Sequence, residues 1–242
     1  MPRSSTPRLP KPSVREAFRR RLLAWWQTAA RDLPWRHTRD PYRVLVSEFM
    51  LQQTQVSRVE DFYPRFLKRF PTIEHLARAR PKAVREEWEG LGYYARARNL
   101  HALAKVVTRH HDATLPREPE ELRKLPGIGP YTAGAVATFA YEQPVAAVDT
   151  NVNRVIRRAF IGSTDARRTT HETRNRAWEI ATALVPRDGR RAWKFNQAVM
   201  ELGALVCKAG KPRCYECPVR DYCKTGRRAG SRVGAEARSG TK

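Results

Sequence analysis

Apolar side chains recur along this 242-residue chain with the spacing of helices. Between Val14 and Ala29 they return every three or four positions, and Pro34 ends the pattern. The run 44–56 continues with the same period towards Phe70, and the prolines at 64 and 71 predict breaks in it. The other stretches with this spacing are 82–89, 95–109, 131–141, 151–160 and 171–185. Because no segment alternates as a strand would, the pattern predicts an all-α fold without internal repeats.

The two ends of the chain lack this periodicity. Residues 1–12 contain four prolines, and residues 225–242 are small, polar and basic, so we expect two disordered tails. The N-terminal segment has no apolar stretch like that of a secretory leader, and no run approaches the ~20 apolar residues of a spanning helix. We therefore expect no membrane partner and a cytoplasmic location.

The charge of the chain indicates its partner. Lys and Arg number 47 against 24 Asp and Glu, a formal net charge of +23. This excess is far beyond what solubility requires and favours a polyanion, of which nucleic acid is the leading candidate. A cationic surface without a dedicated ligand is the alternative. The hydrophobic content of 41% suffices for the core of one large domain or two small ones.

The four cysteines of the chain stand in one short segment with the spacing C-x6-C-x2-C-x5-C. They are Cys207, Cys214, Cys217 and Cys223. Four thiolates on a tight loop can ligate either a zinc ion or a [4Fe-4S] cluster. A disulfide framework is the rival interpretation and would need an oxidising compartment. The spacing favours a metal and, because of its wide gaps, iron-sulfur over zinc, but it leaves zinc open.

Residues 118–142 have the pattern of a hairpin between two helices. A short helix leads into the turn Leu-Pro-Gly-Ile-Gly, and Pro130 opens a second helix. Gly127 and Gly129 lack a β-carbon, so the backbone can adopt positive φ and approach another backbone closely. Amide groups at the start of a helix then become donors for phosphate. The segment predicts a helix-hairpin-helix that grips the DNA backbone, with a plain turn as the alternative.

Two carboxylates stand next to apolar runs. Glu48 lies inside the run 44–51, where burial would raise its pKa and make it a candidate general acid. Its alternative is an exposed place on the polar side of a helix. Asp149 follows the apolar stretch 145–148 and opens the next helix, so taken alone it is an N-cap. Neither residue identifies an activity by itself.

Taken together, these segments resemble the endonuclease III superfamily of DNA glycosylases and, within it, the MutY-type adenine glycosylases. The matching segments occur in family order at 32–36, 47–56, 90–101, 125–136, 148–155, 195–207 and in the cysteine loop. The resemblance implies two helical domains that flank a DNA cleft. One is a six-helix barrel at 35–145 that carries the hairpin. The other joins 13–34 to 146–224 and holds a [4Fe-4S] cluster, which favours iron-sulfur over zinc.

The resemblance also implies catalytic roles. Asp149 would stabilise the positive charge that develops on the deoxyribose, and Glu48 would protonate the leaving adenine at N7, once the base has left the stack. Tyr131 would lie in the pocket near the sugar, where bifunctional relatives have a lysine. Because a phenol cannot form a Schiff base, we expect base release without efficient strand cleavage. Trp35 and Arg36 would be further pocket-side positions, and Gln52 and Gln53 would fill the gap in the duplex. The other DNA-binding positions would be Tyr94, in the duplex-probing segment, and Asn151.

The base to be excised depends on two further positions. Gln197 and Val56 match the adenine-removing pattern, whereas thymine/uracil mismatch glycosylases tend towards an apolar and a small residue there. A glutamine amide can pair with an adenine edge through its donor and its acceptor. Thr150 departs from the pattern, since MutY-type enzymes often have glycine there, and the chain stops at 242, where such enzymes usually continue into a Nudix-like domain that senses 8-oxoguanine.

We therefore expect a monomer, associated with the nucleoid, that excises adenine opposite guanine or 8-oxoguanine in double-stranded DNA. Its preference for the oxidised partner would be reduced unless the tail or another protein restores it. A thymine/uracil mismatch glycosylase is the first alternative. The second is a non-catalytic iron-sulfur protein that binds DNA or senses redox state.

Overall fold

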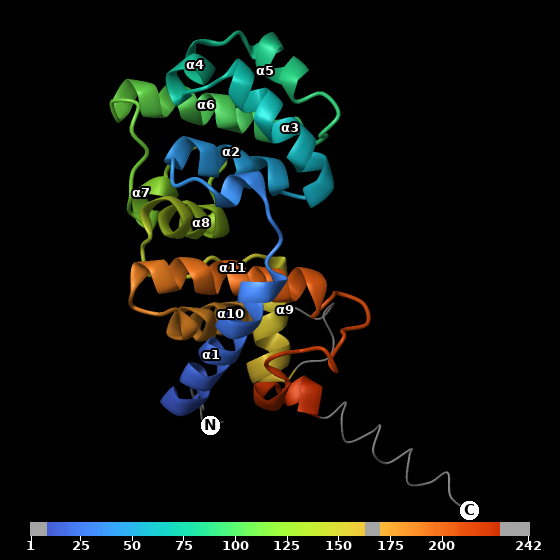
Figure 1. Cartoon of the computed structure of the whole chain (residues 1–242). Coiled ribbons are helices and arrows are strands. Elements are labelled where there is room, and N and C mark those ends of the chain that lie inside the picture. The colour runs from blue at the N-terminus through green and yellow to red at the C-terminus, as the bar shows by residue number, and fades with distance from the viewer. Residues whose placement is uncertain (1–8, 163–169, 228–242) are drawn as a thin grey trace, which may run out of the picture. The chain divides into compact units, whose positions relative to one another are not determined.

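The computed structural model describes residues 9–162 and 170–227 (Figure 1). Within these ranges the regular structure is helical throughout, which confirms the all-α prediction. The predicted tails lie mostly outside the described residues. The chain divides into two compact units, one built from the chain up to Arg31 and from Pro144 onward, the other from Asp32–Gln143. As a division into functional domains, the predicted boundaries stay a proposal.

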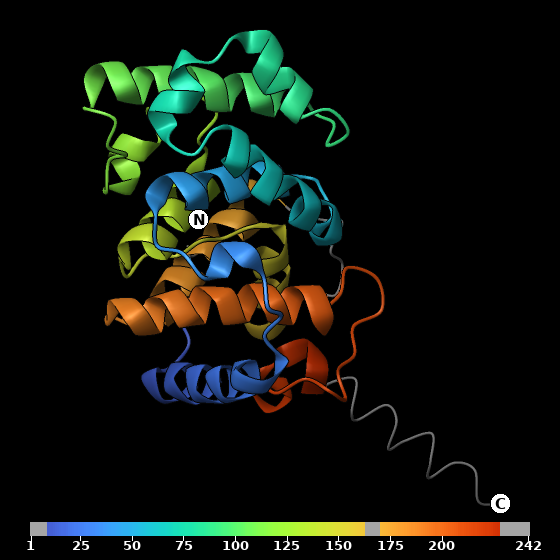
Figure 2. The ribbon, with the colours of Figure 1, turned by 45° about the horizontal axis from the view of Figure 1, so that its top comes forward.

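The unit that joins the two ends of the chain is built around a buried apolar core. Its elements are α1 (Pro12–Ala29), α9 (Thr150–Ile156), the π-helical turn η2 (Arg157–Ile161), α10 (His171–Leu184), α11 (Gly189–Leu205) and the 3-10 turn η3 (Arg220–Tyr222). Phe18 and Leu22 of α1 are fully buried in this core, and α1 runs beside α11 (Figure 2). Arg19 donates to the carbonyl of Leu184 at 2.6 Å, which satisfies an orphan acceptor at the end of α10.

The second unit surrounds α2. Its elements are η1 (Pro34–Arg36), α2 (Pro41–Leu51), α3 (Val56–Arg69), α4 (Ile73–Arg78), α5 (Pro81–Glu87), α6 (Ala95–His110), α7 (Pro119–Leu122) and α8 (Pro130–Tyr141). Helix α2 packs against α3, α6 and α8 (Figure 1). Its residues from Val44 to Met50 are all buried, because apolar residues lie on most sides of this helix and need neighbours there.

Three features differ from the sequence-based expectations. Pro64 does not break its helix but lies inside α3, where buried Tyr63 and Phe66 offset the missing hydrogen bond, which costs about 3 kcal/mol. The apolar period over 44–56 is interrupted by a turn in which Gln53 has φ 57°. Residues 224–227 form a helical turn, so helical structure continues past the predicted start of the tail at 225.

No helix in the described part of the chain is long and apolar enough to cross a bilayer.

Candidate functional site

Glu48 is buried near the end of α2 and meets Tyr131 at the start of α8. The glutamate is 5% exposed, which excludes the alternative of a solvated helix face. The Tyr131 hydroxyl donates to Glu48 Oε2 at 2.7 Å. A hydroxyl that donates to a carboxylate stabilises its ionised form, whereas burial favours the protonated form. The carboxyl group of Glu48 is thus shielded from solvent and held by a hydrogen bond from Tyr131.

The turn that follows α2, residues 52–55, contains both predicted glutamines, Gln52 and Gln53, and they differ in exposure. Gln52 is half-buried, and its Nε2 lies 3.4 Å from Thr132 Oγ1 on α8. Gln53 is exposed and has φ 57°, a left-handed conformation that is strained for a residue with a side chain. The same segment ends at Val56, the partly exposed first residue of α3. These three predicted positions therefore all lie between the C-terminal end of α2, which carries Glu48, and the first residue of α3.

The predicted hairpin is present between α7 and α8. Gly127 has φ +77°, and a β-carbon there would lie 2.7 Å from Asn99 Cβ and 3.1 Å from Phe49 Cε1, so both the backbone and the packing require glycine. Gly129 is different. Its φ of −91° is ordinary, so positive φ was a wrong expectation at this position. A β-carbon on it would meet no protein atom within 4 Å, which leaves the start of α8 open to a partner.

The predicted DNA-contacting positions Trp35, Arg36 and Tyr94 differ in how far they are exposed. Trp35 is 9% exposed and packs its ring edge against Tyr63 at 5.6 Å between centroids, so it belongs to the core. Arg36 is partly exposed beside it. Tyr94 is half-buried, with the Arg85 guanidinium 5.3 Å from its ring.

Sequence reasoning missed the neighbouring Tyr93. This residue is 61% exposed and has φ 48°, so it combines a protruding aromatic ring with a strained backbone. Such outliers cluster at functional sites. The signal in the sequence was the pair of glycines just before it, Gly90 and Gly92, both of which have positive φ.

In the other unit, Asp149 is the N-cap of α9. Its Oδ1 accepts from the Val152 amide at 2.6 Å, and its Oδ2 accepts from Asn151 Nδ2 at 3.0 Å. Burial raises the pKa of the Asp149 carboxyl, and these hydrogen bonds oppose the shift. The capping interpretation is therefore correct, and it leaves a desolvated carboxylate held in one orientation.

A chain of hydrogen bonds leads from this aspartate to the first cysteine. Asn151 Oδ1 accepts from Arg154 Nη2 at 2.7 Å, and Arg154 Nε donates to the carbonyl of Cys207 at 2.8 Å. A β-carbon on Gly203 would lie 2.7 Å from Asn151 Cβ, so α11 can approach α9 only through glycine. The buried Gln197, 7% exposed, lies on the same helix α11.

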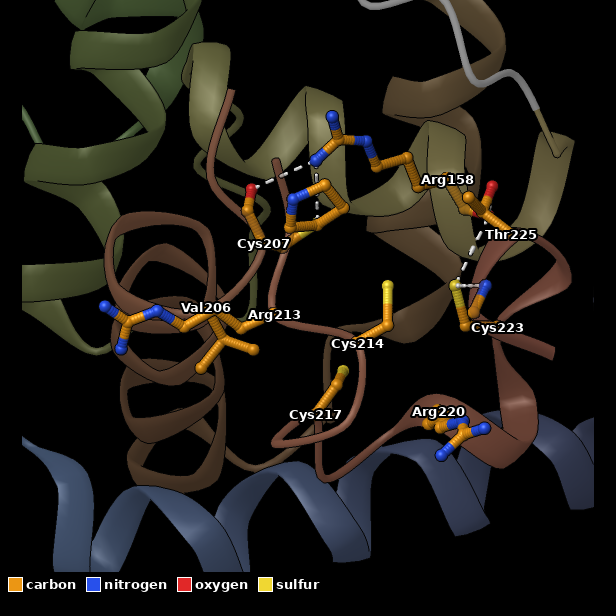
Figure 3. A pocket seen from close by; sticks show the side chains of 11 residues that line it. Arg158, Val206, Cys207, Arg213, Cys214, Cys217, Arg220, Cys223 and Thr225 are labelled. Carbon is orange, nitrogen blue, oxygen red and sulfur yellow. Dashed lines mark hydrogen bonds between the residues drawn. The ribbon is translucent and has the colours of Figure 1, made fainter. Parts of the chain in front are cut away.

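The four cysteines line one hollow (Figure 3). None of them forms a disulfide. Arg158 Nη1 lies 3.4 Å from the sulfur of Cys207, and the Gly226 amide donates to the sulfur of Cys223 at 3.2 Å. Hydrogen bonds of this kind support thiolate ligands. The second bond also ties the helical turn 224–227 to Cys223.

The chemistry of this donor set fits an iron-sulfur cluster. Burial, and to a smaller extent the other three sulfurs, raise the pKa of Cys217 to about 12, so a positive centre is needed to keep all four thiols ionised. Four cysteine sulfurs around one hollow provide the ligands that a [4Fe-4S] cluster requires.

Comparisons with known proteins agree with this geometry. A family model described as "HhH-GPD superfamily base excision DNA repair protein" matches residues 46–182, and one described as "Iron-sulfur binding domain of endonuclease III" matches residues 207–223. An adenine DNA glycosylase of Mycolicibacterium smegmatis is 46% identical over 90% of the chain and 72% of that relative. One of Rattus norvegicus is 44% identical over 88% of the chain and 42% of its own length. The match to the solved structure of a thermostable thymine-DNA glycosylase covers 89% of this chain and 98% of that protein's chain, with a TM-score of 0.80 and 32% sequence identity.

The hairpin, the N-cap aspartate and the four cysteines around one hollow define a helical repair protein with an iron-sulfur centre. The chain belongs to the HhH-GPD superfamily of base excision DNA repair proteins. Its resemblance to the MutY-type adenine glycosylases within that superfamily is confirmed, and so is the iron-sulfur cofactor. The chain spans less than half the length of the rat relative.

Proposed function

We propose that this protein is a monofunctional DNA glycosylase that excises adenine paired with guanine or 8-oxoguanine. The observation that carries the proposal is the buried Glu48 hydrogen-bonded to Tyr131 at 2.7 Å, an acid whose conjugate base is stabilised in advance. The names of the relatives at 44–46% identity support adenine as the base.

The proposed reaction is hydrolysis of the N-glycosidic bond. The bond breaks with its electron pair on the base, and the proton of Glu48 neutralises the charge that develops there. The carboxylate of Asp149 stabilises the cationic sugar, to which water adds with release of one proton. The Asn151 amide and the Val152 amide fix that carboxylate, so its orientation costs nothing at the moment of reaction.

Gln197 and Val56 support adenine over thymine. Gln197 is buried, and its amide offers one donor and one acceptor, as an adenine edge requires. The second candidate, a thymine or uracil mismatch glycosylase, is favoured by the similarity to the solved thymine-DNA glycosylase.

One experiment separates the two candidates. Duplexes with A·8-oxoguanine, A·G, T·G and U·G pairs are incubated with excess protein, and alkali then cleaves at abasic sites. We expect product from the two adenine duplexes. Product from the T·G and U·G duplexes alone would establish the second candidate, and no product from any duplex would refute a glycosylase.

Tyr131 also determines what the enzyme leaves behind. Tyr131 lies at the start of α8, at the position where bifunctional relatives have a lysine. A phenol cannot form an imine with the sugar. We therefore expect intact strands until alkali is added. Efficient trapping of the protein on DNA by borohydride would contradict this assignment.

The DNA backbone would be bound by the hairpin and by the loop that carries the cysteines. Gly129 leaves the start of α8 open, and Lys208, Lys211 and Arg213 are exposed in the cysteine loop. Such contacts bind phosphates without reading sequence. We propose that a single copy of the chain acts on mismatched double-stranded DNA in the nucleoid.

A further inference from the structure

Arg96 of α6 is a buried arginine at the end of α2. Only 7% of it is exposed. Its Nη1 donates to the carbonyls of Phe49 at 2.9 Å and Met50 at 2.8 Å, and to that of Gln52. These are carbonyls of the last turn of α2 and its C-cap, which lack partners within their own helix. One side of the guanidinium thus caps the C-terminus of α2, which leads directly into the Gln52–Gln55 turn.

The other side of the same guanidinium holds the loop between α5 and α6. Nη2 donates to the carbonyls of Gly92 at 3.1 Å and Leu91 at 3.3 Å, and also to Thr54 Oγ1 at 3.0 Å. The guanidinium carbon lies 5.5 Å from the ring centroids of both Trp88 and Tyr93. Two turns that are about forty residues apart in sequence therefore share one side chain.

Burying the charge of Arg96 costs free energy. No carboxylate within residues 9–162 and 170–227 pairs with Arg96, and a buried cation without a counter-ion is unfavourable. The negative end of the α2 dipole and the two ring faces compensate its charge. Lysine could not replace it, since one ammonium cannot reach acceptors on two sides as a planar fork does.

Left-handed backbone occurs in both turns that Arg96 joins, as it does at Asp112, Ala113 and Glu142 elsewhere in the described chain. Gln53 and Tyr93 have φ of 57° and 48°, and Gly90 and Gly92 have φ of 100° and 74°. The two residues with side chains are also exposed, Tyr93 to 61%. Strained residues persist only where the surrounding structure holds them, and here Arg96 supplies the bonds.

We propose that Arg96 is a positioning residue that locks the Gln52–Gln55 turn and the Gly90–Tyr93 turn into one rigid edge, which presents Gln53 and Tyr93 to a distorted base pair. The role at DNA rests on the proposed glycosylase function. The locking itself rests only on the hydrogen bonds and on the two rings. Arg96 touches no reacting group, and it would act through the side chains that it orients.

The test compares Arg96→Lys with Arg109→Lys, the same change at an exposed position of the same helix. Amide hydrogen exchange should become at least tenfold faster in both turns of Arg96→Lys and stay unchanged in the control. Affinity is measured for a duplex with a tetrahydrofuran abasic-site analogue and for the intact duplex. We expect the ratio of the two affinities to fall at least tenfold while intact-duplex affinity changes less than twofold, because the charge is kept.

A double-mutant cycle with Tyr93→Ala separates positioning from general stability. If Arg96 acts through Tyr93, adding Arg96→Lys to Tyr93→Ala should lower the affinity ratio by less than a further twofold. Additive losses, equal losses on both duplexes, or an unchanged ratio would overturn the proposal. Should Arg96→Lys fail to fold, Thr54→Val removes one acceptor and should lower the ratio in the same direction, and an unchanged ratio there would also overturn it.

Failure of the glycosylase function would be visible separately. A wild-type protein that releases no base from any mismatch would refute that function. The exchange rates of the two turns would still decide whether Arg96 locks them.

Discussion

The hydroxyl of Tyr131 determines how readily Glu48 can give up a proton. Phenylalanine at position 131 removes a hydrogen bond to the ionised carboxylate, so the pKa of Glu48 should rise. A hydrogen bond to a charged group contributes about 1.5–3 kcal/mol, which predicts base release slower by roughly 10- to 100-fold at neutral pH. An acid with a higher pKa keeps its proton longer, so the alkaline limb of the pH–rate profile should move to higher pH. Single-turnover rates across pH measure both effects.

The matched control is Tyr141→Phe. It removes a hydroxyl from the same helix, one that donates to the carbonyl of Leu115 at 2.6 Å, and it should leave the pH profile in place. An unshifted limb in Tyr131→Phe would mean that Glu48 is not the acid.

Asp149 is expected to lower stability and to support activity. Burial raises the pKa of the Asp149 carboxyl in the folded protein above its ordinary value of 3.8, so folding disfavours the ionised form relative to the unfolded chain. Its contribution to stability is therefore favourable below the folded pKa and is lost as pH rises through it. Asp149→Asn should slow base release by roughly 10²–10³-fold. The variant should melt at the same or a higher temperature at neutral pH, and this difference should vanish in acid.

Melting curves and single-turnover assays check this prediction together. Asp188→Asn replaces another N-cap, one that accepts from the Arg191 amide at 2.8 Å on an exposed helix end, and it should affect neither activity nor the pH trend. If Asp149→Asn melts clearly lower at neutral pH, Asp149 serves chiefly as a cap.

Sequence reasoning could identify the carboxylates but not their surroundings. Glu48 and Asp149 were visible because a charged residue next to an apolar run needs an explanation. Tyr93 and Arg96 were not, since exposure and strain depend on loop geometry, and local sequence does not encode which carbonyls a distant arginine will reach. The role of Tyr94 stays a prediction, although the adjacent Tyr93 is the more exposed ring.

At the scale of elements, alanine at each of the two hairpin glycines should have a different effect, one on stability and the other on DNA affinity. Gly127→Ala forces a left-handed backbone that costs about 1–2 kcal/mol and places a methyl group 2.7 Å from Asn99 Cβ, so the melting temperature should fall. Gly129→Ala meets no protein atom and should leave the melting temperature unchanged. Its methyl group would instead stand between the start of α8 and a phosphate. DNA affinity should therefore fall equally for intact and mismatched duplexes.

Each glycine variant serves as the control for the other. Thermal melts and equilibrium binding to both duplexes distinguish them. Unchanged affinity in Gly129→Ala would show that the hairpin is a structural turn.

Helical periodicity predicted the long elements because their packing is regular. Helices such as α6 and α10 keep one apolar face over several turns. The six residues of α4 are too few to display a period. Pro64 was misread because the burial of Tyr63 and Phe66 is tertiary information that overrides the local preference of proline. The turn at 52–55 interrupts an unbroken apolar pattern, and the bonds that fix it come from α6.

At the scale of the whole molecule, a net charge of +23 against a polyanion makes binding depend on salt. Replacing Lys208, Lys211 and Arg213 by alanine removes three exposed cations from the cysteine loop. Affinity should then fall by a similar factor for intact and lesion-containing duplexes, and the slope of log K against log salt should decrease by about 2–3. This is the opposite signature to that of Arg96→Lys, which should change the ratio of affinities and not the slope. If the triple variant changed the ratio while the slope stayed constant, the cysteine loop would read the lesion rather than the backbone.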